Sequence, residues 1–159
     1  MNRLTLSAVG LAAVAMALAG CSSSKKTSTS TATTEAAVTT TTAPPTVQVT
    51  QNAREGAILT DAAGRSVYLL AKETGTTSLC TSAQCIANWP AYTATGTPAP
   101  GTGVEGTKLG TATGQVANQV TYFGHLLYYF AHDTAPGDTN GLTIPNWFLV
   151  GADGSQVKK

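Results

Sequence analysis

The chain has 159 residues, enough for one domain with attached segments. Nine basic and eight acidic side chains give a net charge of +1, which argues against a protein that binds nucleic acid through a basic face. Charged residues make up only 11% of the chain, against about 25% in a typical globular protein. Three cysteines in an exported chain leave one without a disulfide partner, unless that one has another role.

The N-terminal segment has the features of a secretory signal peptide. Arg3 precedes an apolar run over residues 4–19 that is short for a bilayer-spanning helix. The run ends in Leu18-Ala19-Gly20-Cys21, which resembles the bacterial lipobox, in which the cysteine thiol is joined to diacylglycerol and becomes the mature N-terminus. We therefore expect a lipoprotein signal peptide at 1–20, and a lipidated Cys21 that attaches the protein to the outer side of the cell membrane. The alternative is an ordinary signal peptide, or an uncleaved anchor, with a cysteine there by chance.

Residues 21–50 form the predicted tether. After Cys21 the segment consists mainly of Ser and Thr and contains no aromatic residue. Such a composition buries too little apolar surface to offset the entropy lost on ordering, so we expect a disordered spacer between membrane and domain. Ser and Thr near Pro44 and Pro45 also suit O-glycosylation.

Residues 51–159 contain every aromatic side chain of the chain and are predicted to form its folded domain. Short apolar runs alternate with turn residues, and no long helical periodicity is present, so the fold class is mostly β, small and antiparallel. The predicted elements are, in chain order, a strand–turn–strand unit over 57–70, a short helix over 82–88, a loop over 93–110, a second strand–turn–strand unit over 119–130, and a hairpin over 147–157.

Two segments sixty positions apart resemble each other. Residues 64–74 align with residues 124–134 without a gap, and Gly, Tyr, Ala, an acid and Thr match. We predict two copies of one hairpin that share a core; the alternative is chance similarity between two hairpins.

The second copy carries the more complete motif. Tyr128, Phe130 and Asp133 follow the pattern Tyr-X-aromatic-X-X-Asp. With the other matches over roughly residues 55–155, this pattern resembles the bacterial lipoproteins that carry a secreted tandem repeat of unknown function. The first copy keeps Tyr68 but has Leu70 and Glu73 in place of the aromatic residue and Asp. The resemblance implies a β architecture and an exported location but no mechanism, and the altered first copy argues against two equivalent sites.

Glu73 and Asp133 allow two interpretations. They could form a symmetric carboxylate pair, as a hydrolase or a cation site would need. The sequence favours turn capping, because each acid precedes turn residues. The backbone N–H groups of such residues can donate hydrogen bonds to an acidic side chain. Tyr68 and Tyr128 are predicted to be core residues with hydrogen-bonded hydroxyls. Trp89 and Trp147 are candidates for stacking on carbohydrate.

The remaining cysteines and the two histidines make a further candidate site. Cys80, Cys85, His125 and His132 together could bind Zn or Cu. The exported location and the lack of a His-X3-5-His spacing, since the two histidines are seven positions apart, favour a Cys80–Cys85 disulfide instead, and we predict neither a metal site nor a cofactor.

Neither Gly-X-Ser-X-Gly nor His-Glu-X-X-His, two motifs of hydrolases, occurs in residues 51–159. We therefore expect a non-catalytic envelope lipoprotein that binds the bilayer through its anchor and interacts with cell-wall glycan or an envelope protein. The alternative function is envelope redox or metal handling through Cys80, Cys85 and the two histidines.

Overall fold

The computed structural model describes residues 47–73 and 75–158. The predicted signal peptide, Cys21 and residues 22–46 of the predicted tether lie outside the described residues. Within those ranges, none of the helices combines the length and the apolar character that crossing a bilayer requires.

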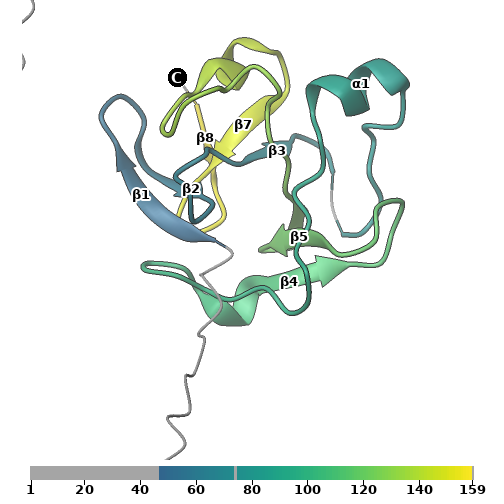
Figure 1. Cartoon of the computed structure of the whole chain (residues 1–159), viewed down its shortest axis with the longest axis horizontal. Coiled ribbons are helices and arrows are strands. Elements are labelled where there is room, and N and C mark those ends of the chain that lie inside the picture. The colour runs from purple at the N-terminus through teal and green to yellow at the C-terminus, as the bar shows by residue number, and fades with distance from the viewer. Residues whose placement is uncertain (1–46, 74, 159) are drawn as a thin grey trace, which may run out of the picture. The chain divides into compact units, whose positions relative to one another are not determined.

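Strands predominate in the described residues and form three small antiparallel sheets, accompanied by one short α-helix (Figure 1). The strands are β1 (Gln48–Asn52), β2 (Gly56–Thr60), β3 (Tyr68–Leu70), β4 (Leu109–Ala112), β5 (Gln119–Tyr122), β6 (His125–Leu126), β7 (Trp147–Val150) and β8 (Gln156–Val157). The helices are α1 (Ala83–Asn88) and the 3-10 helices η1 (Gly106–Lys108) and η2 (Asn140–Thr143). The predicted fold class is confirmed.

The folded domain begins before the predicted boundary at residue 51. Val47 is 0% exposed and belongs to the core, and β1 pairs with β2 from Gln48 onward. The prediction that the tether extends to residue 50 is therefore wrong for its last four residues. Composition misplaced the boundary, because Val47 and Val49 alternate with polar residues as in a half-buried strand but follow a long Thr-rich segment.

Several local elements form where the sequence predicts them. The hydroxyl of Ser82 caps α1 by accepting from the Cys85 backbone N–H, at 3.2 Å. β5 and β6 form a hairpin whose turn residues Phe123 and Gly124 both have positive φ, 48° and 79°, as a type I′ turn requires. β7 and β8 form the last predicted hairpin. The predicted loop over 93–110 also contains η1 and the start of β4.

The strands of the first predicted unit separate after a tight turn. Asp61 and Arg65 close that turn, but β2 then pairs with β1 whereas β3 pairs with β7. Strand pairing in this domain therefore crosses between the two copies.

The two copies have the same order of elements and are intertwined. Each has two paired strands, a turn, the motif tyrosine, the acid, a short helix (α1 or η2) and a tryptophan; Tyr68 lies in β3, whereas Tyr128 follows β6 and pairs through isolated bridges. Tyr68 and Tyr128 face each other and exchange two backbone hydrogen bonds of 2.9 Å. Ala91 of the first copy pairs with Tyr128, and Leu149 of the second pairs with Tyr68. The motif tyrosines therefore lie side by side at the centre of a pseudo-twofold arrangement.

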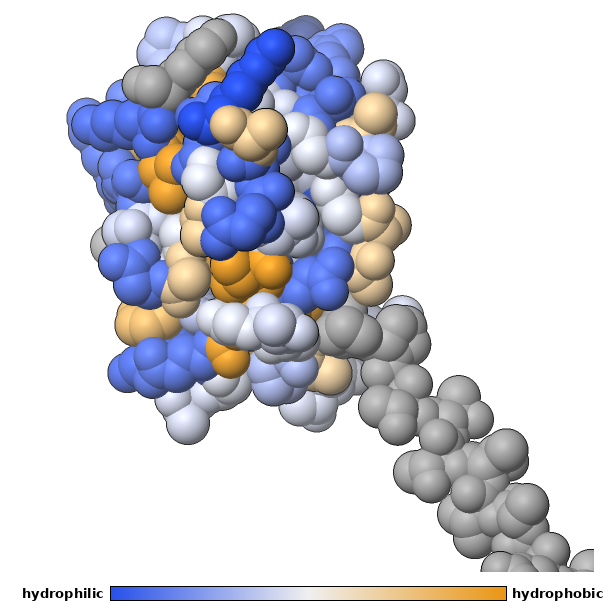
Figure 2. All heavy atoms as spheres, turned by 90° about the vertical axis from the view of Figure 1, so that its left-hand side faces the viewer, coloured by the Kyte–Doolittle hydropathy of each residue, from blue (hydrophilic) through white to orange (hydrophobic). Residues whose placement is uncertain are grey.

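Aromatic rings from both copies fill the core beneath these tyrosines. Trp89 and Trp147 stack with ring centroids 3.7 Å apart and an interplanar angle of 5°. Tyr68 packs edge-on against Trp89, and Tyr128 packs edge-on against Trp147. The β1 side of the surface, in contrast, is largely hydrophilic, with apolar residues in small separate patches (Figure 2).

Candidate functional site

Each motif tyrosine donates a hydrogen bond to the acid of the other copy. The Tyr68 hydroxyl donates to Asp133 Oδ2 at 2.5 Å, and the Tyr128 hydroxyl donates to Glu73 Oε1 at 3.2 Å. In each copy the acid follows a turn after the motif tyrosine, closed by the Glu73 N–H to the Leu70 carbonyl and by the Asp133 N–H to the Phe130 carbonyl. The tyrosine and the acid of the Tyr-X4-acid motif therefore make their contacts between the copies. The sequence of one copy alone does not reveal these contacts.

The two acids also hold the loops that follow them. Asp133 Oδ1 accepts from the Asn140 backbone N–H at 2.9 Å, and Glu73 Oε1 accepts from the Leu79 and Cys80 backbone N–H groups at 2.6 and 3.3 Å. Asn140 and Cys80 are sixty positions apart, so the capping contact is also repeated. The acids cap backbone groups as the favoured interpretation predicts, although in more distant loops than expected. The turn next to Asp133 is capped by Asp138, which accepts from the N–H groups of Thr134 and Ala135.

Burial sets the protonation of both tyrosines. Burial, followed by the hydrogen bond to Asp133, raises the pKa of Tyr68 far above its usual value of 10.0. Burial also raises the pKa of Tyr128 to about 12. Both hydroxyls therefore remain proton donors to their acids throughout the physiological pH range.

The two acid networks differ in how completely they are satisfied. Asp133 is 6% exposed and each of its oxygens has a partner. Glu73 is 2% exposed. Its Oε1 accepts from the Tyr128 hydroxyl and from the Leu79 and Cys80 backbone N–H groups, whereas its Oε2 has no hydrogen-bond partner among the described residues. The acids accept from separate sets of donors, so the hydrogen bonds do not join them into one carboxylate pair.

A cavity of about 380 Å³ lies beside the Glu73 network. Its apolar wall includes Trp89 and Pro90, and its rim includes Ile86 and Val116, which are 53% and 39% exposed. The wall is formed by α1 and the residues after it, and by the β4–β5 connection, which lie on the same side of the domain in Figure 1. The complete lining is Ser78, Cys80, Thr81, Ile86, Trp89, Pro90, Ala91, Gln115, Val116, Gln119 and Tyr128.

Three polar side chains of the cavity lining form one hydrogen-bonded group. The Ser78 hydroxyl donates to the Tyr128 hydroxyl, 2.7 Å away, and the Tyr128 hydroxyl donates to Glu73 Oε1 at 3.2 Å. Gln119 is fixed by a 2.9 Å hydrogen bond from its Nε2 to the Leu127 carbonyl, and it also hydrogen-bonds to Tyr128. An apolar cavity with a few fixed polar groups is the usual form of a small-molecule site. We refer to it below as the first-copy cavity.

The corresponding position of the second copy, sixty residues later, is tightly packed. Gly141 packs directly on the rings of Tyr68 and Trp89, and a Cβ added there would lie 2.8 Å from each ring. The position sixty residues earlier is Thr81, which lines the first-copy cavity. The close contact at Gly141 thus seals the ring of Tyr68, whereas that of Tyr128 borders the cavity.

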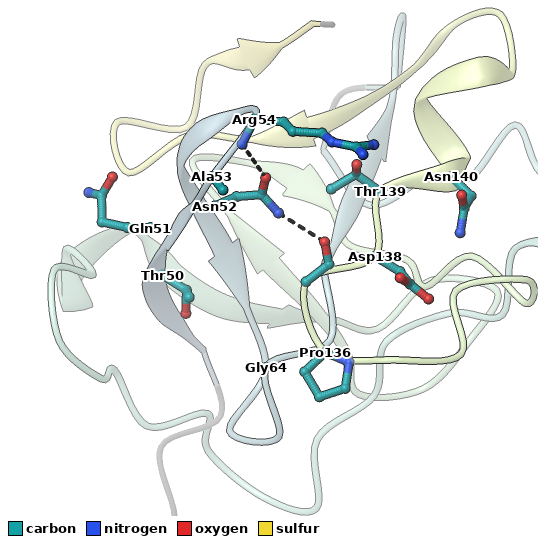
Figure 3. A pocket seen from close by; sticks show the side chains of 11 residues that line it. Thr50, Gln51, Asn52, Ala53, Arg54, Gly64, Pro136, Asp138, Thr139 and Asn140 are labelled. Atoms are coloured by element: carbon teal, nitrogen blue, oxygen red, sulfur yellow. Dashed lines mark hydrogen bonds between the residues drawn. The ribbon is translucent and has the colours of Figure 1, made fainter.

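A second, more polar cleft lies between the β1–β2 connection and residues 136–140 (Figure 3). Asn52 joins its two sides: Nδ2 donates to the Gly137 carbonyl at 2.9 Å, and Oδ1 accepts from the Arg54 backbone N–H at 2.9 Å. The carboxylate of Asp138 is engaged in its own turn. Because the internal structure already uses these polar groups, this cleft is the weaker candidate.

The cysteines and histidines do not form one site. Cys80 and Cys85 form a disulfide with a Cα–Cα distance of 5.4 Å, as predicted. His132 packs edge-on against Phe130, and His125 lies in β6. In the described ranges, no group of three or more His, Cys, Asp or Glu side chains is arranged to hold a metal ion. The structure therefore gives no support to the redox or metal-handling alternative.

Trp89 and Trp147 are not available as carbohydrate platforms. They are 4% and 5% exposed, and they stack on each other. That expectation is wrong, because each tryptophan serves to pack one copy against the other.

The sequence analysis missed the polar residues of the first-copy cavity. Ser78 and Gln119 lie in unremarkable Thr-rich and polar stretches, and only the fold brings them to Tyr128. One available signal was the offset of sixty positions continued beyond the aligned segments, which sets Ser78 against Asp138 and Thr81 against Gly141. These are differences between copies at positions where the structure now shows different contacts.

The comparisons with known proteins agree with the repeat. Residues 106–150 match a family described as a secreted repeat of unknown function. Sixty positions earlier in the chain, the same range covers residues 46–90. This earlier range starts one residue before Val47, the first residue that the structure describes. No curated protein and no solved structure matches the chain significantly. The family resemblance predicted from the motif is confirmed over the matched residues, and it suggests a location outside the cytoplasm.

Proposed function

We propose that this chain, whose residues 106–150 match a family described as a secreted repeat of unknown function, is a lipid-anchored, non-catalytic module that binds a small amphipathic ligand at the cell envelope. The first-copy cavity is the observation that carries the proposal. Its volume of about 380 Å³ lies within the usual range of ligand sites.

The anchor is argued from the N-terminal sequence. Leu18-Ala19-Gly20-Cys21 resembles a lipobox, and a secreted family agrees with export. A diacylglyceryl group supplies two chains, which is the number that stable membrane attachment requires. The tether would then hold the domain outside the cytoplasm, within reach of ligands or proteins of the envelope.

The apolar and polar groups that line the cavity support a binding role. The apolar wall offers burial, at roughly 25 cal/mol per Å² of apolar surface, and the polar groups of Ser78, Gln119 and Tyr128 orient what is buried. Both acids accept hydrogen bonds from a motif tyrosine and from backbone N–H groups, so each has a structural role. The residues present thus favour recognition over catalysis.

Binding is tested with the full-length protein in lipid nanodiscs, with benzyl alcohol as a probe and saturation-transfer NMR as the readout. Val116→Phe adds volume at the cavity rim and should weaken binding by about tenfold or more. Ile144→Phe is the matched control, because Ile144 is 38% exposed, close to the 39% of Val116, and does not line the cavity. Equal binding by both variants, or no binding to the unaltered protein, would contradict the proposal.

The anchor has a separate test. Intact-mass measurement of the mature protein should show a chain that begins at Cys21 and carries a diacylglyceryl group, and Cys21→Ser should lack both features. A mature chain with an unmodified Cys21 thiol would refute the anchor and leave the binding proposal standing.

A further inference from the structure

The inner polar groups of the first-copy cavity are already used within the protein. The Ser78 hydroxyl donates to Tyr128, and its oxygen accepts from the Cys80 backbone N–H at 3.0 Å. The Tyr128 hydroxyl in turn donates to Glu73, and Gln119 hydrogen-bonds to Tyr128 and to a backbone carbonyl. A hydrocarbon that covers these groups therefore removes none of their hydrogen bonds, and burial of apolar surface is the main contribution the interior can make to binding.

The cavity is lined by uncharged side chains. All lining residues come from two runs, 75–104 and 109–132, that contain no Asp, Glu, Lys or Arg. The acid behind the lining, Glu73, is 2% exposed. A ligand recognised by its charge needs an opposite charge in the site, so this lining favours an apolar group instead.

Exposed apolar side chains gather at the opening of the cavity. Of the four large apolar side chains that are exposed in the described residues, Ile86 and Val116 line the cavity, and Leu79 directly follows the lining residue Ser78. Leu79 is 57% exposed, the most of the four. The opening lies on the α1 side of the domain, away from β1 (Figure 1). Exposed apolar residues around a pocket are typical of a surface that contacts a membrane or a partner.

The proposed anchor keeps this opening close to lipid. Residues 22–46 separate Cys21 from Val47, the first described residue of the core. A disordered chain of this length spans about 25–30 Å root-mean-square, and a domain of about 100 residues has a radius of gyration of about 13 Å. The tether thus allows any face of the domain to reach the bilayer, where acyl chains are at high local concentration.

We infer that the first-copy cavity takes up the acyl chain of a bilayer lipid, with the three exposed apolar side chains of the opening in contact with the membrane surface. The end of the chain lies against Trp89, and the lipid headgroup stays outside, beside the exposed lining residues Thr81 and Gln115. This inference rests on the proposed function, including its anchor, and adds the chemical class of the ligand.

Trp89 supplies the readout, because Trp89 and Trp147 are the two tryptophans of the chain and are stacked on each other. Bromine atoms quench tryptophan fluorescence only at short range. Full-length lipidated protein is placed in phosphatidylcholine nanodiscs whose acyl chains carry bromine near their ends, and in matched nanodiscs without bromine. The brominated chains should lower the fluorescence about twofold, as expected when half or more of the cavities are occupied. An excess of benzyl alcohol should restore it, because both compete for one cavity.

A charge at the opening then assigns the quenching to this site. Val116→Asp should remove most of the quenching, whereas Ile144→Asp, the control of matched exposure, should leave it unchanged. Raising the salt concentration from about 0.05 to 0.5 M should have no effect, because no charge of the lining takes part.

The outcomes separate this inference from the proposed function. Absence of quenching, or quenching that survives Val116→Asp or an excess of benzyl alcohol, would overturn the inference. Benzyl alcohol binding that Val116→Phe weakens would then still support the proposed function. Absence of both the quenching and the benzyl alcohol binding would overturn the proposed function as well.

Discussion

In both copies of the repeat, an acid binds the motif tyrosine of the other copy, but the surroundings of the two tyrosines differ. In the second copy, Asp133 is satisfied on both oxygens and Gly141 seals the ring of the tyrosine that Asp133 binds. In the first copy, Glu73 accepts through Oε1 alone among the described residues, and the tyrosine that donates to it borders a cavity. We call each motif tyrosine and the acid of the other copy a crossed pair. The Tyr68–Asp133 pair is therefore closed and structural, whereas the Tyr128–Glu73 pair borders the site for which we propose a ligand.

The comparison shows how duplication can separate stability from binding. The backbone bonds between Tyr68 and Tyr128 and the stacked tryptophans are common to both copies and hold them together. The loops after the acids differ, at Ser78 against Asp138 and at Thr81 against Gly141. A change in a loop can thus open a cavity without altering the shared centre.

The largest expected effect is at that shared centre. Trp147→Ala removes one of two stacked rings and leaves a space against Trp89 and Tyr128, so unfolding should become easier by about 3–5 kcal/mol. Trp89→Ala should cost a similar amount, because the stacked rings are shared. Urea unfolding of both variants measures this, and a cost below about 1 kcal/mol for either would show that the shared stack does not hold the copies together.

Removing one hydroxyl at a time should separate the two crossed pairs. Tyr68→Phe leaves buried Asp133 Oδ2 without its donor and should cost about 2 kcal/mol. Tyr128→Phe should cost about 1 kcal/mol, because Glu73 Oε1 keeps the backbone N–H donors of Leu79 and Cys80. Urea midpoints at equal slopes give the comparison. A larger cost for Tyr128→Phe would reverse the assignment of the closed pair.

Filling the sealed position should cost more than trimming its counterpart. Gly141→Ala places a methyl group 2.8 Å from the rings of Tyr68 and Trp89 and should destabilise the domain by about 1–3 kcal/mol. Thr81→Ala, sixty positions earlier, removes atoms from an exposed cavity residue and should change stability by less than about 0.5 kcal/mol. Equal effects in thermal unfolding would show that the two positions are packed alike.

A smaller effect should appear in acid. The backbone N–H groups of Ala135 and Thr134 hold the pKa of Asp138 below its usual 3.8, so the ionised group favours the folded state. That contribution is present above about pH 4 and is lost as the pH falls through the lowered pKa. Asp138→Asn should flatten the acid limb of the stability–pH curve slightly, whereas Ser78→Ala, at the matching position, should not change its slope. A steeper acid limb in Asp138→Asn would contradict the sign.

The sequence revealed the local elements well because local signals define them. Ser82 and Trp89-Pro90 delimited α1, and Asp153-Gly154 marked the last turn. The repeat was visible because its spacing is regular. Strand partners were not visible, since β3 pairs with β7 across the chain and the alternation of side chains is the same for any partner.

The cavity and the crossed pairs were beyond sequence reasoning for a related reason. Ser78, Val116 and Tyr128 come from three separate segments, and nothing in any one segment indicates that the three meet. The capping role of the acids was correctly favoured, but the tyrosine partner of each lies in the other copy. The motif in one copy shows the spacing of tyrosine and acid, but it does not show that each tyrosine binds the acid of the other copy.

The crossed pairing itself is tested most directly by a double-mutant cycle. Tyr68→Phe is combined with Asp133→Asn of the other copy and, separately, with Glu73→Gln of its own copy, and the free energies of unfolding are measured in urea. The account predicts a coupling of about 1–3 kcal/mol between Tyr68 and Asp133, and additivity within about 0.5 kcal/mol between Tyr68 and Glu73. Strong coupling within one copy and none between the two copies would contradict it.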